Sequence, residues 1–221
     1  MSSSPARPPV PDALPRAPEA AKRGRRAAPP GDRHIFFRHW LRRPLAIGAV
    51  LPSGNRVARA MARELSLERH GAVLELGGGT GALTRGLIAA GCPIDRLVVV
   101  EREAELADYL AWRFAGLRVV CGDACDADAL LTAAGIDKLA TVVSSLPIKW
   151  FPRAAQRAVL DGCFARLGPG GHFVQLTNAL ASPIPAAELG LAGEEVARIW
   201  AHFLPVQIWR YRRHPAADGP C

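Results

Sequence analysis

The stretch "AVLELGGGTGALTRGLIAAG", residues 72–91, decides the fold of this chain. Its first five residues predict a buried strand, and residues 82–91 predict a helix that ends at a glycine. The glycines from Gly77 to Gly81 let the backbone between them approach a ligand closely, and the start of the helix offers free N–H groups. A strand, a glycine-rich turn and a helix in this order are typical of α/β folds that bind nucleotides.

The same alternation of strand and helix continues to residue 213. Further strands are expected at 97–101, 118–123, 139–145, 172–177 and 206–213. Helices are expected at 56–67, with Ser53 as N-cap, and at 104–115, 127–135 and 152–167. Apolar strands that alternate with helices predict an α/β fold, with a parallel sheet covered on both faces.

The basic charge is confined to the first third of the chain. The net charge of the 221 residues is +8, with +9 on residues 1–72 and −1 on residues 73–221. Residues 1–33 hold eight prolines and seven Lys or Arg, which predicts a disordered basic tail. We expect an amphipathic helix and a lid within 34–72, a core at 73–213 and a short tail at 214–221. Nucleic acid and anionic lipid are both candidate partners of such a basic region.

The cysteines and the apolar runs narrow the class of protein. The five cysteines form no Cys-x-x-Cys pair and no cluster with zinc-site spacing, so we expect reduced thiols, a cytoplasmic protein and no metal. The N-terminus has no apolar signal region, and no uncharged apolar run reaches the ~18 residues of a membrane span. If the protein meets a membrane, it lies on the surface.

The segment "HIFFRHWLRRPLAIGAVLPSG", residues 34–54, combines aromatic and basic side chains. On a helical wheel one arc is apolar, one is basic, and Arg43 lies at the border. The segment suits three roles: packing on the sheet, an arm that binds RNA, or a helix in a membrane interface. The apolar arc holds Phe36, Phe37, Trp40 and Leu41, and the opposite arc holds Arg38 and Arg42.

Acidic residues at the ends of the predicted strands make the glycine motif a more specific sign of a cofactor site. Glu75 precedes the turn, Glu101 ends the second strand 20 residues after Gly81, and "GDA", residues 122–124, ends the third. A carboxylate placed like Glu101 accepts hydrogen bonds from ribose hydroxyls. Gly77-x-Gly79-x-x-Ala82 alone also fits a dinucleotide fingerprint. The expected cofactor-binding residues are Glu75, Gly77, Gly78, Gly79, Thr80, Gly81, Glu101, Arg102, Gly122, Asp123, Ala124, Ser144, Ser145 and Ser53.

Together these motifs resemble the class I S-adenosylmethionine (SAM) methyltransferases over residues 72–213. The resemblance implies a Rossmann-like seven-stranded sheet with a final antiparallel hairpin, SAM as cofactor and S-adenosylhomocysteine as product. It also implies that Glu75 meets the methionine end of the cofactor and that Asp123 accepts from the adenine amine.

The fourth strand leads into "SSLPIKWF", residues 144–151. Methyltransferases that act on exocyclic base amines carry here an Asn/Asp-Pro-Pro or Asn-Leu-Pro motif followed by an aromatic residue. This chain has Ser145 at the first position and Ile148 after Pro147, which disfavours adenine methylation. The scaffold nevertheless resembles the rRNA adenine dimethyltransferases.

A closer likeness joins four segments in order: "FFRHWLRRPLAIGAVLPSG", "LELGGGTGALTRGLI", "SSLPIKWFP" and "FVQLTNALASPIP". They resemble the bacterial phospholipid N-methyltransferases of the PmtA type over residues 35–213. This implies methylation of phosphatidylethanolamine, through its mono- and dimethyl forms, toward phosphatidylcholine at the inner face of the cytoplasmic membrane. It favours the interfacial helix, anionic lipid as partner, and residues 47–54 as a lid over the cofactor. Related enzymes methylate ornithine lipids.

No residue stands out as a general base. Ser145 and the backbone carbonyl of Leu146 are candidates for aligning the amine, and Tyr109 and Asp123 are candidate proton acceptors. The aromatic faces of Trp150 and Phe151 suit a methylated cation. An RNA methyltransferase and a non-catalytic protein that binds SAM or lipid remain the alternatives, and the oligomeric state is not predicted.

Overall fold

The computed structural model describes residues 52–201 and 204–214 of the chain. The expected basic tail at 1–33 and the expected amphipathic helix with Phe36 to Arg43 lie outside the described residues. So do most of the expected lid and most of the C-terminal tail at 214–221.

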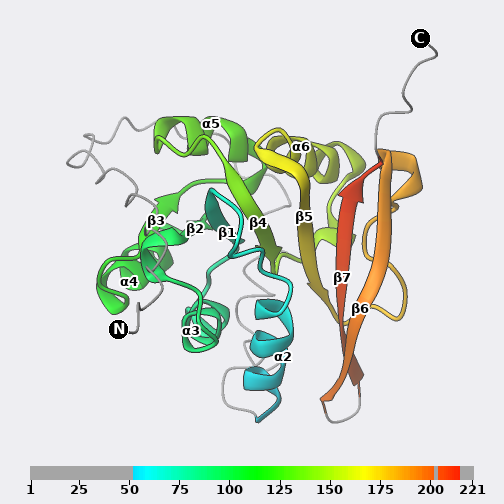
Figure 1. Ribbon diagram of the computed structural model, residues 1–221, viewed down its shortest axis with the longest axis horizontal. Coiled ribbons are helices and arrows are strands. Elements are labelled where there is room, and N and C mark those ends of the chain that lie inside the picture. The colour runs from blue at the N-terminus through cyan, green and yellow to red at the C-terminus, as the bar shows by residue number, and fades with distance from the viewer. Residues whose placement is uncertain (1–51, 202–203, 215–221) are drawn as a thin grey trace, which may run out of the picture.

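Seven strands form one sheet in the order β3-β2-β1-β4-β5-β7-β6 (Figure 1). The strands are β1 Ala72–Leu76, β2 Leu97–Glu101, β3 Arg118–Cys121, β4 Leu139–Ser144, β5 Leu167–Thr177, β6 Leu191–Ala201 and β7 Leu204–Arg213. Strands β1 to β5 pair in parallel, and β7 pairs antiparallel with both β5 and β6. This confirms the expected α/β class with a final antiparallel hairpin.

Helices cover both faces of the sheet, as Figure 1 shows. They are α2 Pro52–Ala62, α3 Ala82–Ala89, α4 Ala104–Arg113, α5 Ala127–Ala133 and α6 Arg153–Phe164, with 3-10 turns η2 Ile94–Arg96, η3 Ala124–Asp126, η4 Ile148–Trp150 and η5 Ala187–Leu189. Alternation along β1 separates two cores: Leu74 packs with α5 and α6, whereas Val73 packs with α2, α3 and α4. Within the described residues, no helix is both long enough and apolar enough to cross a membrane.

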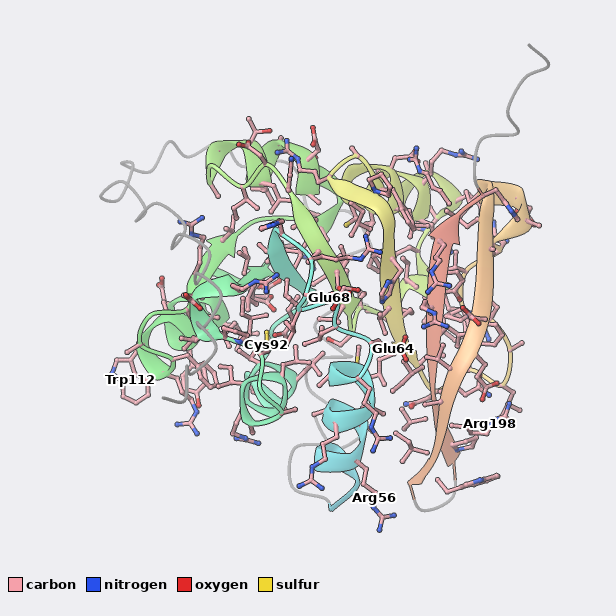
Figure 2. The ribbon with its side chains drawn as sticks, in the orientation of Figure 1. Arg56, Glu64, Glu68, Cys92, Trp112 and Arg198 are labelled. Atoms are coloured by element: carbon pink, nitrogen blue, oxygen red, sulfur yellow. The ribbon has the colours of Figure 1, made fainter. Side chains whose placement is uncertain are left out.

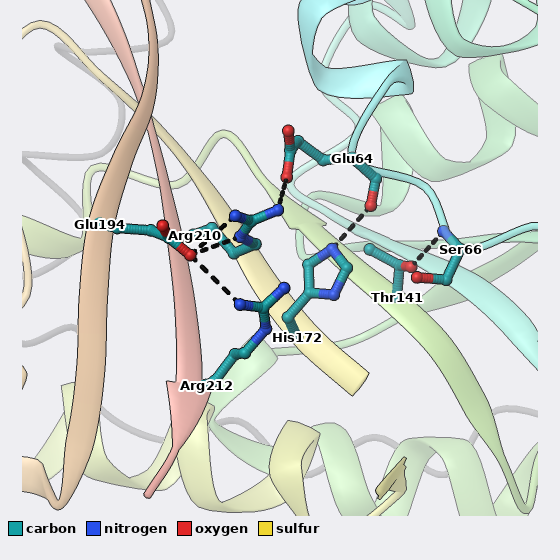
Figure 3. Close-up of polar contacts among 7 residues, drawn as sticks. All are labelled: Glu64, Ser66, Thr141, His172, Glu194, Arg210 and Arg212. Atoms are coloured by element: carbon teal, nitrogen blue, oxygen red, sulfur yellow. Dashed lines mark hydrogen bonds and ion pairs between the residues drawn. The ribbon is translucent and has the colours of Figure 1, made fainter. Parts of the chain in front are cut away.

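The link between α2 and β1 is held to the sheet by charged and polar contacts (Figure 3). Arg210 of β7 lies 2.9 Å from the Glu64 carboxylate and 2.8 Å from that of Glu194. The backbone carbonyl of Glu64 lies 2.7 Å from Nε2 of the buried His172. Burial lowers the pKa of His172, which favours the neutral ring at this position. These contacts fix the end of α2 against β5 and β7.

Three expectations about element boundaries are wrong. Ser53 was expected as an N-cap, but α2 already begins at Pro52, so Ser53 lies within the first turn. The helix expected at 56–67 was to end at Leu67, but α2 ends at Ala62. The chain leaves the helix because the backbone N–H of Ser66 donates to Thr141 Oγ1 at 2.9 Å, which holds the link to β4. At the other end of the sheet, β5 begins at Leu167, so residues 168–171, "GPGG", belong to a strand and not to a turn after the helix.

Strand β6 was not expected from residue patterns. Its sequence, "LAGEEVARIWA", has charged residues at both odd and even positions, so charge would lie on both faces of the strand. It lies at the edge of the sheet, where exposed positions tolerate charge and weaken the apolar signal.

Candidate active site

The carboxyl ends of β1, β2, β3 and β4 meet at one edge of the sheet, where ligands bind in open α/β folds. The glycine-rich turn after β1 lies there. At Gly79, with a φ of +53°, a Cβ would meet no atom within 4 Å, so the turn is open toward the ligand side. At Gly77, with a φ of +80°, a Cβ would lie 2.8 Å from Leu146 Cδ2. The glycine turn and the loop after β4 are therefore in direct contact.

Glu101 joins the first two turns of the site. Its Oε2 accepts from the backbone N–H of Gly79 at 2.8 Å, and its Oε1 accepts from the N–H of Glu103 at 2.9 Å. The residue is only 2% exposed, yet it lines the cavity described next. A carboxylate with its orientation set by two backbone donors is preorganised to accept from hydroxyls at its remaining lone pairs.

A cavity of about 280 Å³ lies between the ends of β2, β3 and β4. It is lined by Gly77, Val100, Glu101, Arg102, Gly122, Asp123, Ala124, Cys125, Leu146, Pro147, Trp150, Phe151 and Pro152. The lining brings together expected cofactor residues from three turns with expected acceptor residues from the loop after β4. Sequence reasoning missed Val100, Cys125, Pro147 and Pro152, which are apolar or neutral neighbours of the expected residues.

Asp123 is fixed beside the cavity by its own turn. Its Oδ1 accepts from the backbone N–H of Cys125 at 2.9 Å, which caps η3. Its Oδ2 lies 3.8 Å from Nη1 of Arg102. The side chain is thus held at the mouth of the cavity, with lone pairs left for a further donor.

The loop from Ser145 to Phe151 is anchored at several points. The Ser145 hydroxyl donates to the Gly77 carbonyl at 2.9 Å, and the backbone N–H of Leu146 donates to Ser144 Oγ at 3.3 Å. The buried amide of Gln175 donates to the Leu146 carbonyl at 2.9 Å. The buried amide of Gln156 donates to the carbonyls of Ile148 and Phe151, both at 3.0 Å.

These anchors occupy groups that were expected to align the acceptor amine. The Ser145 hydroxyl is used as a donor to the glycine turn. The Leu146 carbonyl already accepts two hydrogen bonds, one from the Gln175 amide and one from the backbone N–H of Ile148 at 2.8 Å. A carbonyl oxygen accepts two hydrogen bonds, so the Leu146 carbonyl has no lone pair left for the acceptor amine. Gln156 and Gln175 were not found from the sequence, because an isolated glutamine in a helix or strand carries no motif.

The chain is similar in sequence and in fold to known methyltransferases. No family model matches it. It is 34% identical over 150 residues to an ornithine lipid N-methyltransferase of Singulisphaera acidiphila, which covers 66% of this chain and 78% of that protein. The chain belongs to the class I SAM-dependent methyltransferases.

Two further similar proteins agree with the assignment of this chain to the methyltransferases. It is 34% identical over 122 residues to a ribosomal RNA small subunit methyltransferase A of Mesorhizobium japonicum, and spans 43% of that protein's length. A solved TehB-like SAM-dependent methyltransferase from Corynebacterium glutamicum has the same fold, with a TM-score of 0.54 at 17% identity, covering 80% of this chain and 96% of that one.

The residues present fit the SAM cofactor of this family. Glu101 is oriented beside an open glycine turn, and Asp123 and Arg102 lie at the same cavity. We expect Glu101 to hold the ribose and Asp123 with Ala124 to hold the adenine. The backbone of the glycine turn, which includes Thr80, lies where the methionine portion would bind.

Glu75 of the methyltransferase does not line this cavity. Its side chain is fully buried, and neither carboxylate oxygen has a hydrogen-bond partner among the described residues. Burial raises the pKa of Glu75 to about 8, and the charge of Glu101 adds to this increase. The hydroxyl and N–H of Thr84 lower the pKa in part, although no hydrogen bond of ordinary geometry joins the two side chains. The carboxyl group therefore lies behind the glycine turn.

The structure does not bring Tyr109 to the acceptor loop. Tyr109 lies on the outer face of α4, with its ring centroid 6.0 Å from that of Trp112, because Ala107 and Leu110 are the buried positions of that helix. Ser53 lies in the first turn of α2, and its side chain is outside the description. Among the described residues, no group of three or more His, Cys, Asp or Glu side chains could hold a metal ion.

Proposed function

We propose that this methyltransferase N-methylates the primary amine of an aminolipid headgroup at the membrane surface. The resemblance to the PmtA-type phospholipid N-methyltransferases favours phosphatidylethanolamine as substrate, with its mono- and dimethyl forms, toward phosphatidylcholine. Ornithine lipid is the second candidate, because the relative in Singulisphaera acidiphila is an ornithine lipid N-methyltransferase. The two lipids share the chemistry of a primary amine beside acyl chains.

The observation that carries the proposal is the joint lining of one cavity by cofactor-binding and apolar acceptor residues. Bound SAM supplies an electrophilic methyl group, so the main task of the protein is to position a neutral amine in line with it. A primary amine has a pKa near ~10, by analogy with lysine. Leu146, Pro147 and Phe151 offer an apolar wall, and desolvation there lowers the pKa of the amine.

The aromatic face of Trp150 suits the cationic products. Trp150 lines the cavity, and the ammonium of Lys149 already lies 5.5 Å from its ring centroid. This contact has cation–π geometry. A methylated ammonium has the same charge and more apolar surface, so its contact with the Trp150 ring is more favourable still.

RNA methylation is the weaker candidate. The ribosomal RNA methyltransferase relatives share only the core, since the chain spans 43% of the length of one of them. The loop after β4 offers Ser145 and Ile148 where an amide and a stacking aromatic residue would hold a base. A non-catalytic role is disfavoured because the same open cavity has residues for SAM and residues for the aminolipid.

The deciding experiment uses the full-length chain, labelled SAM and vesicles of phosphatidylglycerol with either phosphatidylethanolamine or ornithine lipid. We expect label in the extracted aminolipid, with mass spectrometry counting the methyl groups added. Label in ribosomal RNA, with none in either lipid, would contradict the proposal. Cofactor binding without transfer to any acceptor would identify a binding protein.

A further inference from the structure

Large apolar side chains are exposed at few places in the described residues. Five are prominent: Tyr109, Trp112, Trp150, Leu180 and Trp200. Single exposed apolar residues are normal in proteins, so their positions matter more than their number. Three of them lie toward the carboxyl end of the sheet, the end that holds the cavity: Trp150 and Leu180 in connections, and Trp200 in the last two residues of β6. We call these three residues the carboxyl-end rim.

The strand register shows how far the hairpin of β6 and β7 projects. Gln175 pairs with Ser144, the last residue of β4, and Thr177 pairs with Gln207. Trp200 pairs with Pro205, which lies two residues beyond Gln207. Trp200 is thus four residues past the end of β4, or about 13 Å along the strands at ~3.3 Å per residue. Figure 1 shows this hairpin extending past β5 beside the start of α2.

The other two members of the rim follow the neighbouring strands β4 and β5. Trp150 lies in η4 directly after β4 and lines the cavity itself. Leu180 lies in the loop that follows β5, and it is 73% exposed. The rim residues thus come from three different segments, all at the carboxyl end of the sheet: η4, the loop after β5 and the end of β6.

Cations accompany the rim. Lys149 adjoins Trp150, and the exposed Arg56 lies in α2 near its N-terminal end. Arg198 lies near the hairpin tip, where Glu195 pairs with it at 2.7 Å. Figure 2 shows Arg56 and Arg198 at the same end of the molecule. Tryptophan beside Lys or Arg is the combination that membrane interfaces favour, since the ring suits the headgroup level and the cations attract anionic lipid.

We propose that the carboxyl-end rim is a membrane-docking surface that inserts into the headgroup region of an anionic bilayer. The inference rests on the proposed function, because an enzyme that methylates a lipid headgroup must turn its cavity toward the bilayer. Trp200 and Leu180 enter the interface on one side of the opening, and Trp150 does so at the opening itself. The sheet then stands with its carboxyl end on the membrane, and a headgroup reaches the cavity without leaving the bilayer.

The test compares the double variant Trp200→Ser/Leu180→Ser with a matched control. Both positions are strongly exposed, so the substitutions remove no core contact. The control is Trp112→Ser, which removes a side chain that is 77% exposed. Trp112 lies in the last turn of α4, which runs from β2 back toward the start of β3, and Figure 2 shows it far from Arg198.

Two measurements are made on the full-length chain. In the first, flotation with vesicles of phosphatidylglycerol and phosphatidylethanolamine should show a partition coefficient at least ~10-fold lower for the double variant than for wild type or Trp112→Ser. In the second, methyl transfer to vesicles should fall in proportion. Transfer to a short-chain aminolipid, kept monomeric below its micelle concentration, should remain within about 2-fold of wild type.

Equal vesicle partitioning of the double variant and wild type would overturn the inference. An equal loss of activity on the monomeric lipid would also overturn it, since the two side chains would then act in the site or in the fold. If the wild type were a dimer that the double variant dissociates, the rim would be a self-association surface instead. Wild type that docks on vesicles through the rim but methylates no aminolipid would refute the proposed function and leave the docking surface standing.

Discussion

The Oε2 atom of Glu101 lies 2.8 Å from the backbone nitrogen of Gly79, 22 residues earlier in the chain. One carboxylate therefore sets the position of the glycine turn and also faces the cavity. We propose that the same residue also binds the ribose of the cofactor.

Replacing Glu101 should weaken cofactor binding. We expect Glu101→Ala to lower SAM affinity by about 10- to 100-fold, because the ribose loses an acceptor and the Gly79 N–H is left unpaired. Glu101→Gln retains one acceptor and should lose less. Isothermal titration calorimetry measures both values. The same affinity in all three proteins would refute the role of Glu101 in binding the ribose.

The buried carboxyl of Glu75 should make the stability of the cofactor-free protein depend on pH. The folded pKa of about 8 lies above the usual 4.5, so the folded state holds its proton where the unfolded state has released it. Below about pH 4.5 Glu75 does not lower the free energy of unfolding. As the pH rises toward 8, the free energy of unfolding falls. At about 1.4 kcal/mol per pKa unit, the full penalty is on the order of 5 kcal/mol.

Glu75→Gln should remove most of this penalty. Urea unfolding should show the variant more stable than wild type at pH 8, with the difference shrinking toward pH 5. The exposed Glu68 gives a control, and Glu68→Gln should follow the wild-type profile at every pH. A Glu75→Gln variant whose profile matches wild type would mean that the carboxyl is not held protonated.

The ion pairs of Arg210 should stabilise the attachment of α2. The partly buried Arg210 lies between Glu64 and Glu194, so Arg210→Met leaves the Glu64 carboxylate without its partner. Glu194 keeps its ion pair with Arg212. We expect a loss of about 1–3 kcal/mol in the free energy of unfolding and faster amide exchange in α2. Arg198→Met breaks an exposed pair that solvent screens, so it should destabilise the protein much less than Arg210→Met. Equal effects of the two substitutions would show that the Arg210 contacts add nothing specific.

The glutamines that hold the acceptor loop should affect transfer more than cofactor binding. Gln175→Leu removes one of the two donors to the Leu146 carbonyl at nearly constant volume. We expect kcat to fall by about 10-fold, because the acceptor loses its alignment, while the Kd for SAM changes by less than about 2-fold. A parallel fall in SAM affinity would mean that Gln175 supports the whole site.

The N-terminal segment, outside the described residues, gives a separate membrane prediction. Changing Arg38, Arg42 and Arg43 to Glu should abolish binding to anionic liposomes, because like charges then face each other. SAM affinity should stay nearly the same. If both are lost together, residues 36–43 do not form a docking helix separate from the cofactor site.

Local patterns determined most of the core of this protein. Residues 72–91 predicted a strand, a turn and a helix, because the pattern of apolar residues and glycines within a short segment indicates its secondary structure. The same reasoning found β2, β4 and β7, and Glu101 could be named as a site residue from its place at a strand end. Strand β6 was missed, since an edge strand with charge on both sides lacks the apolar alternation of a buried one.

Tertiary structure decided what the site residues do. The sequence placed Glu75 and Tyr109 with the ligands, but the first is buried behind the turn and the second faces outward from α4. It gave no signal for Gln156 and Gln175, which are 8 and 29 residues from the carbonyls that they hold. A residue's type limits the contacts that it can make. Which contact forms depends on strand register and helix packing, and these bring distant segments together only in the folded chain.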